Sequence, residues 1–430
     1  MLGQSRTPRE YAPGKAPLKW FALAYAALIV YGSLFPFTGW SYAGVKPFGF
    51  LTAQWPAHHS RPDILTNVLA YIPLGLLFVL WWRRRRFVVG PVILATMIGA
   101  ALSFLMEYLQ QFLPSRDASL MDLITNVSGT LVGAVLAILV RSDWLPGRVL
   151  MEWRARWVKP GRLFDLGLLA IGAWALSQVT PLVPSLDVGK LHHGVAPLWQ
   201  TLHHPEHFNS VQASVYALYI AGLALLARTL GNPGRPVVAL FFAFVAAVLL
   251  YKIPAVSRQL SLEALGGALA AAALMLPFLG LRTRAMACTS ALLILGGFAC
   301  AELASGPGST RSAFNWLPFR GQMENTLTGI ASTLESLWPS AALAYLARFA
   351  STPEHRRAVA WCGGVALSLA VFALEWHQQF LPGRYADITE VLVMAAAWLL
   401  VWIVPIARTA VRSRQGIAPR ASLNSRAMRM

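Results

Sequence analysis

The chain has 430 residues, of which 56% are hydrophobic and only 13% are charged, and its formal net charge is +18. Long uncharged runs in such a composition exclude an ordinary soluble protein and indicate a polytopic membrane protein. The basic residues form short clusters between these runs, so nucleic acid is not an expected partner. The three cysteines all lie in apolar runs and predict neither disulfides nor a metal site.

Apolar, charge-poor runs of about 17 to 25 residues are long enough to cross a bilayer as helices. Open strands are excluded, because backbone groups in hydrocarbon must find hydrogen bonds within their own segment or a closed barrel. The chain is therefore predicted to be an all-α transmembrane helical bundle of about 12 spans. The predicted spans are residues 20–37, 64–82, 87–112, 120–140, 166–183, 208–227, 236–253, 262–281, 285–304, 326–347, 358–381 and 388–407.

The distribution of Lys and Arg predicts the orientation of these spans. If the N-terminus is cytoplasmic, 27 of the 36 basic residues fall on the cytoplasmic side. Cytoplasmic loops carry an excess of Lys and Arg, so this bias favours twelve crossings with both termini cytoplasmic.

A ten-residue stretch occurs twice, as EYLQQFLPSR at Glu107 to Arg116 and as EWHQQFLPGR at Glu375 to Arg384. A weaker third copy is marked by Pro254, Arg258 and Glu263. This periodicity predicts three four-helix repeats. We name them unit one (1–141, the best preserved), unit two (142–282, degenerate, preceded by a basic, Trp-rich cytoplasmic interfacial linker) and unit three (283–408), followed by a basic cytoplasmic tail at 409–430.

Polar side chains gather near the predicted outer end of unit one. Glu107, Gln110 and Gln111 are spaced at i, i+3 and i+4 and share one helical face, while Asp122 and Asn126 lie four apart on the next span. A carboxylate within a span is costly and usually faces a partner or a water-filled cavity. Gly129 and Gly133 continue the face of Asn126 and predict close helix packing.

Two interpretations of these charges remain open. In the structural one, Arg116 folds back toward Glu107 or Asp122 and fastens a hairpin, and Asp122 also caps its helix. In the functional one, Glu107, Arg116, Asp117 and Asp122 line an outward-facing pocket and are the candidate catalytic residues. Arginine suits a phosphate or carboxylate ligand, and a carboxylate suits general-base catalysis or cation binding.

Unit three repeats part of this pattern with Glu375, Arg384 and Glu390, but Met394 stands where unit one has Asn126. Unit one is therefore the better candidate for a working site. The HHPEH segment at 203–207 suggests a metal cluster, yet it lacks the helical spacing of a metal-binding pair. No metal and no cofactor are expected.

The pattern of unit one resembles the VanZ-like family, small integral membrane proteins named for a member linked to teicoplanin resistance. It combines Asn and Pro in the second helix, E-x-x-Q-x-x-x-P-x-R, and then an acid with Asn-x-x-Gly in the fourth helix. The resemblance implies the cell envelope and a bacterial inner-membrane location, but no particular reaction. It is carried by Asp63, Asn67, Pro73, Gly75, Glu107, Gln110, Gln111, Pro114, Arg116, Asp117, Asp122, Asn126, Gly129 and Gly133.

The leading hypothesis is an outward-facing site that binds or modifies an anionic lipid-linked envelope or polysaccharide intermediate. The expected partners are membrane lipids, a lipid-linked glycan precursor and envelope-biosynthesis enzymes. One alternative is a transporter or flippase, although the repeats are parallel rather than inverted. Another is a non-catalytic scaffold for envelope biosynthesis, and enzymatic activity stays open. The candidate substrate-binding residues are Asp63, Asn67, Gln110, Gln111, Asn126, Glu375, Arg384 and Glu390.

Overall fold

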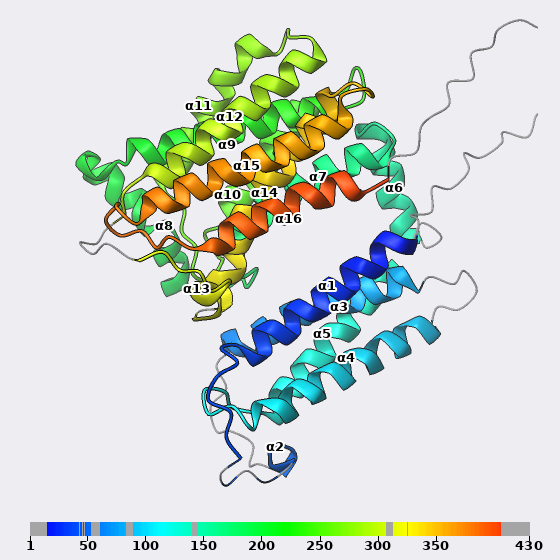
Figure 1. Cartoon of the computed structure of the whole chain (residues 1–430). Coiled ribbons are helices and arrows are strands. Elements are labelled where there is room, and N and C mark those ends of the chain that lie inside the picture. Colours follow the sequence, from blue (N-terminus) through cyan, green and yellow to red (C-terminus); the bar gives the residue numbers. More distant parts are fainter. Residues whose placement is uncertain are drawn as a thin grey trace, which may run out of the picture.

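The computed structural model describes residues 15–42, 44, 46, 48–52, 61–82, 89–139, 145–306, 313–324 and 326–405. These residues form α-helices joined by loops and two short 3₁₀ turns, and no strand occurs among them (Figure 1). The α-helices are α1 (Lys15–Leu34), α2 (Gly49–Thr52), α3 (Arg61–Trp81), α4 (Val89–Gln110), α5 (Leu120–Leu139), α6 (Leu145–Trp157), α7 (Arg162–Val179), α8 (Val188–His203), α9 (Ser210–Leu230), α10 (Val237–Tyr251), α11 (Leu262–Met275), α12 (Thr283–Leu303), α13 (Arg320–Glu324), α14 (Thr326–Ala350), α15 (Arg356–Gln378) and α16 (Ile388–Ile403).

The all-α prediction is confirmed, and within the described residues each predicted span overlaps a helix, although several helices end earlier than predicted. Within the described residues, seven helices are long and apolar enough to cross a membrane. Four further apolar helices are shorter, with 10–17 residues each. A multi-pass membrane protein follows from these helices, whereas the count of twelve crossings stays a prediction.

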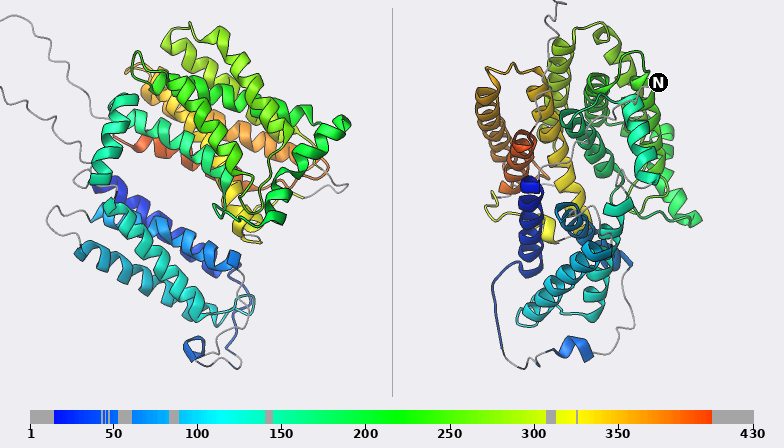
Figure 2. Two further views of the ribbon diagram at one scale, coloured as in Figure 1. Left: turned by 180° about the vertical axis from the view of Figure 1, so that it is seen from behind. Right: turned by 90° about the vertical axis from the view of Figure 1, so that its right-hand side faces the viewer.

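Unit one forms a bundle of its own beside a larger bundle built from α7 to α16 (Figures 1 and 2). Its core packs Tyr71 and Leu74 of α3 against Ala134 of α5. The larger bundle has one continuous core, in which Trp174 of α7 and Tyr345 of α14 are fully buried. Units two and three are therefore fused by packing, while unit one keeps a separate core.

Glycines allow α3 and α5 to cross with their backbones in contact. A Cβ atom added to Gly133 would overlap the carbonyl oxygen of Ile72, and one added to Gly75 would overlap that of Thr130. The predicted role of Gly133 in close packing is confirmed. This crossing sets the distance between the two helices that carry Asn67, Asp122 and Asn126.

The described loops gather at two ends of the molecule. At one end, Lys159 donates from Nζ to the Thr229 carbonyl at 2.9 Å, and Arg162 donates from Nη1 to the Pro405 carbonyl at 3.1 Å. The helix α6 lies at this end with Trp153 exposed, as an interfacial linker would require. Which end faces the cytoplasm stays a prediction, and the predicted tail lies outside the described residues.

Candidate functional site

A cavity of about 730 Å³ lies at the seam between unit one and the larger bundle. Unit one contributes α1, α3, α5 and the end of α4 with the turn that follows it. The opposite wall comes from the end of α7 and from α13 and α14. The volume lies within the range of about 300 to 1,000 Å³ that is typical of small-molecule sites.

Most of the residues proposed for unit one line this cavity. They come from three helices and one turn, so their convergence depends on the folded arrangement. Gln111 is not among the lining residues, and its Nε2 donates to the Tyr108 carbonyl at 3.2 Å. The Asp63 side chain lies outside the described residues. The predicted residues that line the cavity are Asn67, Glu107, Gln110, Arg116, Asp117, Asp122 and Asn126.

Glu107 is the most deeply buried carboxylate of the cavity, with 3% of its surface exposed. Its Oε2 accepts a hydrogen bond from the Ser119 backbone N–H at 2.8 Å. Among the described residues, its Oε1 has no hydrogen-bond partner. The turn after α4 therefore fixes one oxygen of this carboxylate and leaves the other available.

Asp122 does not cap α5 as expected. Ser119 occupies that position, since its Oγ accepts from the Met121 backbone N–H at 3.1 Å. Asp122 instead accepts through Oδ1 from Asn67 Nδ2 on α3, at 2.7 Å. This bond ties α3 to α5 and holds the Asp122 carboxylate at the cavity wall.

Asn126 lies one helical turn beyond Asp122 on α5. Its Nδ2 donates to Ser103 Oγ on α4 at 3.0 Å. Its Oδ1 is buried without a hydrogen-bond partner, and the residue is only 6% exposed. A buried amide oxygen without a partner is costly, so this atom marks a place where a ligand can supply a donor.

Arg116 does not fold toward Glu107 or Asp122, and the expected ion pair is wrong. Its Nε donates to the Phe35 carbonyl and its Nη2 to the Gly32 carbonyl, both at 3.1 Å. These carbonyls belong to the end of α1, where a helix has no backbone partners for its last oxygens. Burial lowers the pKa of Arg116 from its ordinary value, although arginine stays charged in proteins.

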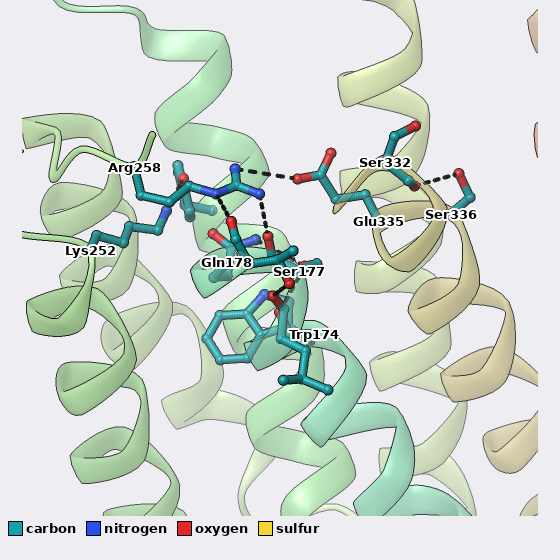
Figure 3. A network of polar contacts seen from close by, with 11 residues as sticks. Trp174, Ser177, Gln178, Lys252, Arg258, Ser332, Glu335 and Ser336 are labelled. Atoms are coloured by element: carbon teal, nitrogen blue, oxygen red, sulfur yellow. Dashed lines mark hydrogen bonds and ion pairs between the residues drawn. The ribbon is translucent and has the colours of Figure 1, made fainter. Parts of the chain in front are cut away.

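The same contact occurs in unit two. Arg258 donates from Nε to the Thr180 carbonyl at 2.8 Å and from Nη2 to the Ser177 carbonyl at 2.9 Å. Figure 3 shows Arg258 between the end of α7 and Glu335 of α14, whose Oε1 lies 3.9 Å from Nη1. Since Thr180 also lines the cavity of unit one, Arg258 helps to position that wall.

Unit three has the contact as well, since Arg384 donates from Nε to the Ala304 carbonyl at 2.8 Å and from Nη2 to that of Ala301. In all three units the arginine holds two carbonyls three residues apart at the end of the first helix. Unit two makes this contact without any counterpart of Glu107. We call it the arginine clamp and assign it a structural role. Triplication would explain its recurrence, and triplication stays a prediction.

The remaining candidates form a separate cluster in unit three. One carboxylate oxygen from each of Glu302, Glu375 and Glu390 lies within 4.8 Å of the others, the one such grouping of metal-ligating side chains among the described residues. Gln378 Nε2 donates to Glu302 Oε2 at 2.5 Å. Oxygen ligands of this kind suit a hard cation. The HHPEH segment forms no comparable cluster within the described part of the chain.

Sequence reasoning missed Glu302 and the far wall of the cavity. Glu302 lies on the first helix of unit three, and a carboxylate near the end of an apolar helix was a signal that could have found it. Thr180, Gln322 and Thr333 complete the cavity from units two and three. No local pattern marks these three, because their position depends on packing between bundles.

Comparison with known protein families gives a match to unit one. Comparisons with curated proteins and with solved structures found no match. Residues 20–141 match the family model VanZ/LLP1, and this segment spans α1 to α5 and carries the polar wall of the cavity. The match supports a VanZ-like membrane domain in unit one.

Proposed function

We propose that the cavity of unit one is an outward-facing site for an anionic lipid-linked envelope or polysaccharide intermediate. The observation that carries this proposal is that one cavity combines a polar end with long apolar walls. Such a cavity fits an amphiphile better than a small, fully polar metabolite.

The polar end lies at the turn between α4 and α5. The exposed Asp117 lines it there beside Arg116. The clamp uses two of the five N–H groups of a guanidinium, so three remain for a ligand. An anionic group at this end would find a fixed cation close to the opening.

The apolar walls come from facing helices of different units. Leu28 and Ile29 of α1 lie on one side, and Ile330 and Leu334 of α14 lie on the other. A hydrocarbon chain between them would stay in contact with apolar side chains on both sides. The resemblance of unit one to VanZ-like proteins agrees with an envelope substrate, since that family is linked to glycopeptide resistance.

If the bound intermediate is also modified, Glu107 is the group that we assign as general base. Its buried carboxylate is held through Oε2, and Oε1 is free to accept a proton. Binding without reaction requires the same geometry, so the first test is a binding test.

The test uses the full chain in lipid nanodiscs and a fluorescent polyprenyl phosphate that carries N-acetylglucosamine. We expect saturable binding that Glu107→Gln weakens by at least tenfold. The matched control is Glu152→Gln, since Glu152 is an exposed carboxylate on α6, away from the cavity. Equal binding by both variants would refute the proposal.

A cellular test replaces Glu107 and Arg116 singly while the amount of protein in the membrane is monitored. Because Arg116 also clamps α1, only variants present at the normal level are informative. A normal envelope phenotype with either residue replaced would count against the proposed site.

A further inference from the structure

We infer that the deep polar end of this cavity recognises the hydroxyl groups of a sugar, and that the phosphate of the ligand stays at the opening. This inference rests on the proposed function and names the part of the ligand that the buried residues select. It follows from which atoms around the cavity still lack hydrogen-bond partners.

Around the cavity, the described buried atoms of unit one that lack a partner are two acceptors and one hydroxyl, Tyr71 Oη, which can donate or accept. Glu107 Oε1 has no partner among the described residues, and Asn126 Oδ1 is buried without one. The amide nitrogens nearby each make one hydrogen bond within the protein, since Gln110 Nε2 donates to the Ser33 carbonyl at 2.9 Å and Asn126 Nδ2 to Ser103. A ligand that donates to these two oxygens and can also accept from Tyr71 Oη fits this set, and sugar hydroxyls do both.

The opposite wall presents another acceptor. Gln322 of α13 lines the cavity, and its Oε1 is buried without a hydrogen-bond partner. The segment that carries it is held against unit one, since Tyr31 Oη donates to the Pro318 carbonyl at 2.6 Å. A sugar ring carries hydroxyls around its edge, so it can donate to both walls at once.

The charge in the buried part of the cavity, away from Arg116 at the opening, disfavours phosphate. Glu107 is the buried carboxylate there, whereas the exposed Asp117 lies beside Arg116 at the opening. The Nε and Nη2 groups of Arg116 already hold carbonyls of α1, so this edge of the fork cannot take a phosphate in bidentate fashion. Phosphate oxygens beside Glu107 Oε1 and Asn126 Oδ1 would face two acceptors, and among the described unpartnered atoms of unit one only Tyr71 Oη could donate to them.

A metal ion explains these carboxylates less well. The described residues bring three carboxylate oxygens within 4.8 Å of one another at Glu302, Glu375 and Glu390, but not at this cavity. A cation site needs several oxygen ligands close together, and the described carboxylates of this cavity do not form such a group of three.

The experiment is a competition assay with the full chain in nanodiscs and the same fluorescent lipid-linked sugar. The competitors share one tail: dodecyl β-glucoside carries hydroxyls without phosphate, and dodecyl phosphate carries phosphate without a sugar. We expect the glucoside to displace the probe and the phosphate to be at least tenfold weaker. Stronger displacement by dodecyl phosphate would overturn the inference while leaving the proposed function intact. Failure of the unchanged protein to bind the probe would refute the proposed function itself.

Two variants test which residues recognise the glucoside. Gln322→Met keeps the size of the side chain and breaks no side-chain hydrogen bond within the described protein, and Glu107→Gln removes the charged acceptor. Each should weaken the glucoside roughly 10- to 100-fold, as expected for lost hydrogen bonds, while the melting temperature of Gln322→Met stays unchanged. Unchanged glucoside affinity in Gln322→Met, or glucoside binding that EDTA abolishes, would refute sugar recognition by these acceptors.

Discussion

The arginine clamp predicts that Arg116→Ala destabilises unit one, whatever ligand the cavity takes. Arg116 makes two hydrogen bonds from a charged donor, both at 3.1 Å, to the carbonyls of Gly32 and Phe35. A hydrogen bond to a charged group contributes about 1.5 to 3 kcal/mol, and Arg116 is only half-buried, so the low end applies. The expected loss is about 3 kcal/mol for both bonds together. Reversible unfolding of the full chain by SDS in mixed micelles measures it.

Two comparisons separate the clamp from a ligand-binding role. Arg116→Lys keeps the charge, but a single ammonium cannot reproduce the guanidinium fork, so about half of the loss should remain. Arg258→Ala should cost a similar amount, because Arg258 makes the same two bonds in unit two. Arg148→Ala on exposed α6 is the control and should change stability by less than about 0.5 kcal/mol. An Arg116→Ala variant with normal stability and no probe binding would refute the clamp.

Three further predictions follow from particular contacts. Gly133→Ala should destabilise unit one by about 1 to 3 kcal/mol in SDS unfolding, because its Cβ would overlap α3, whereas Gly266→Ala, in open space on α11, should be neutral or slightly stabilising. Tyr31→Phe should lower the free energy of unfolding by about 1 kcal/mol, because it removes the hydrogen bond to the loop before α13. The variant should also speed crosslinking between cysteines placed on either side of the seam between unit one and the larger bundle, and an unchanged crosslinking rate would contradict this prediction. A hydrogen bond from its own backbone N–H and one from His204 lower the pKa of Glu206. The stability that these bonds give the folded state is therefore present above the ordinary pKa of glutamate and is lost as the pH falls through the lowered pKa. His204→Ala should raise the pKa of Glu206 in a carboxyl NMR titration, and an unchanged pKa would refute the contact.

The sequence was sufficient to predict the helices and one wall of the site. Glu107 and Gln110 lie three residues apart on an apolar helix, and this spacing fixes them to one face wherever the helix packs. Asp122 and Asn126 share a face for the same reason, and a short turn brings the two helices together. These spacing rules depend only on residues close in sequence, so they apply without knowledge of the remaining chain.

The partners of these residues were not predictable in the same way. Arg116 was expected to meet a carboxylate, but the unpaired carbonyls at the end of α1 lie about 80 residues earlier and offered two acceptors that match its fork. Gln322 reaches the cavity because α13 packs on α1, a contact between different units. A prediction that pairs Arg116 only with charged side chains therefore overlooks neutral backbone carbonyls as its acceptors.

The arginine clamp also places the sites of units one and three in register and shows where they differ. Arg116 holds Gly32 and Phe35, and Arg384 holds Ala301 and Ala304, so Ser33 corresponds to Glu302.

In unit one, Gln110 donates to the backbone of Ser33, and acceptors remain free in an open cavity. In unit three, Gln378 donates instead to the Glu302 side chain, which lies against Glu375 and Glu390. The same arrangement of helices and arginine thus carries separate hydrogen-bond acceptors in unit one and clustered carboxylates in unit three. Because clustered carboxylates need protons or a cation to coexist, unit three would not take the ligand that we propose for unit one.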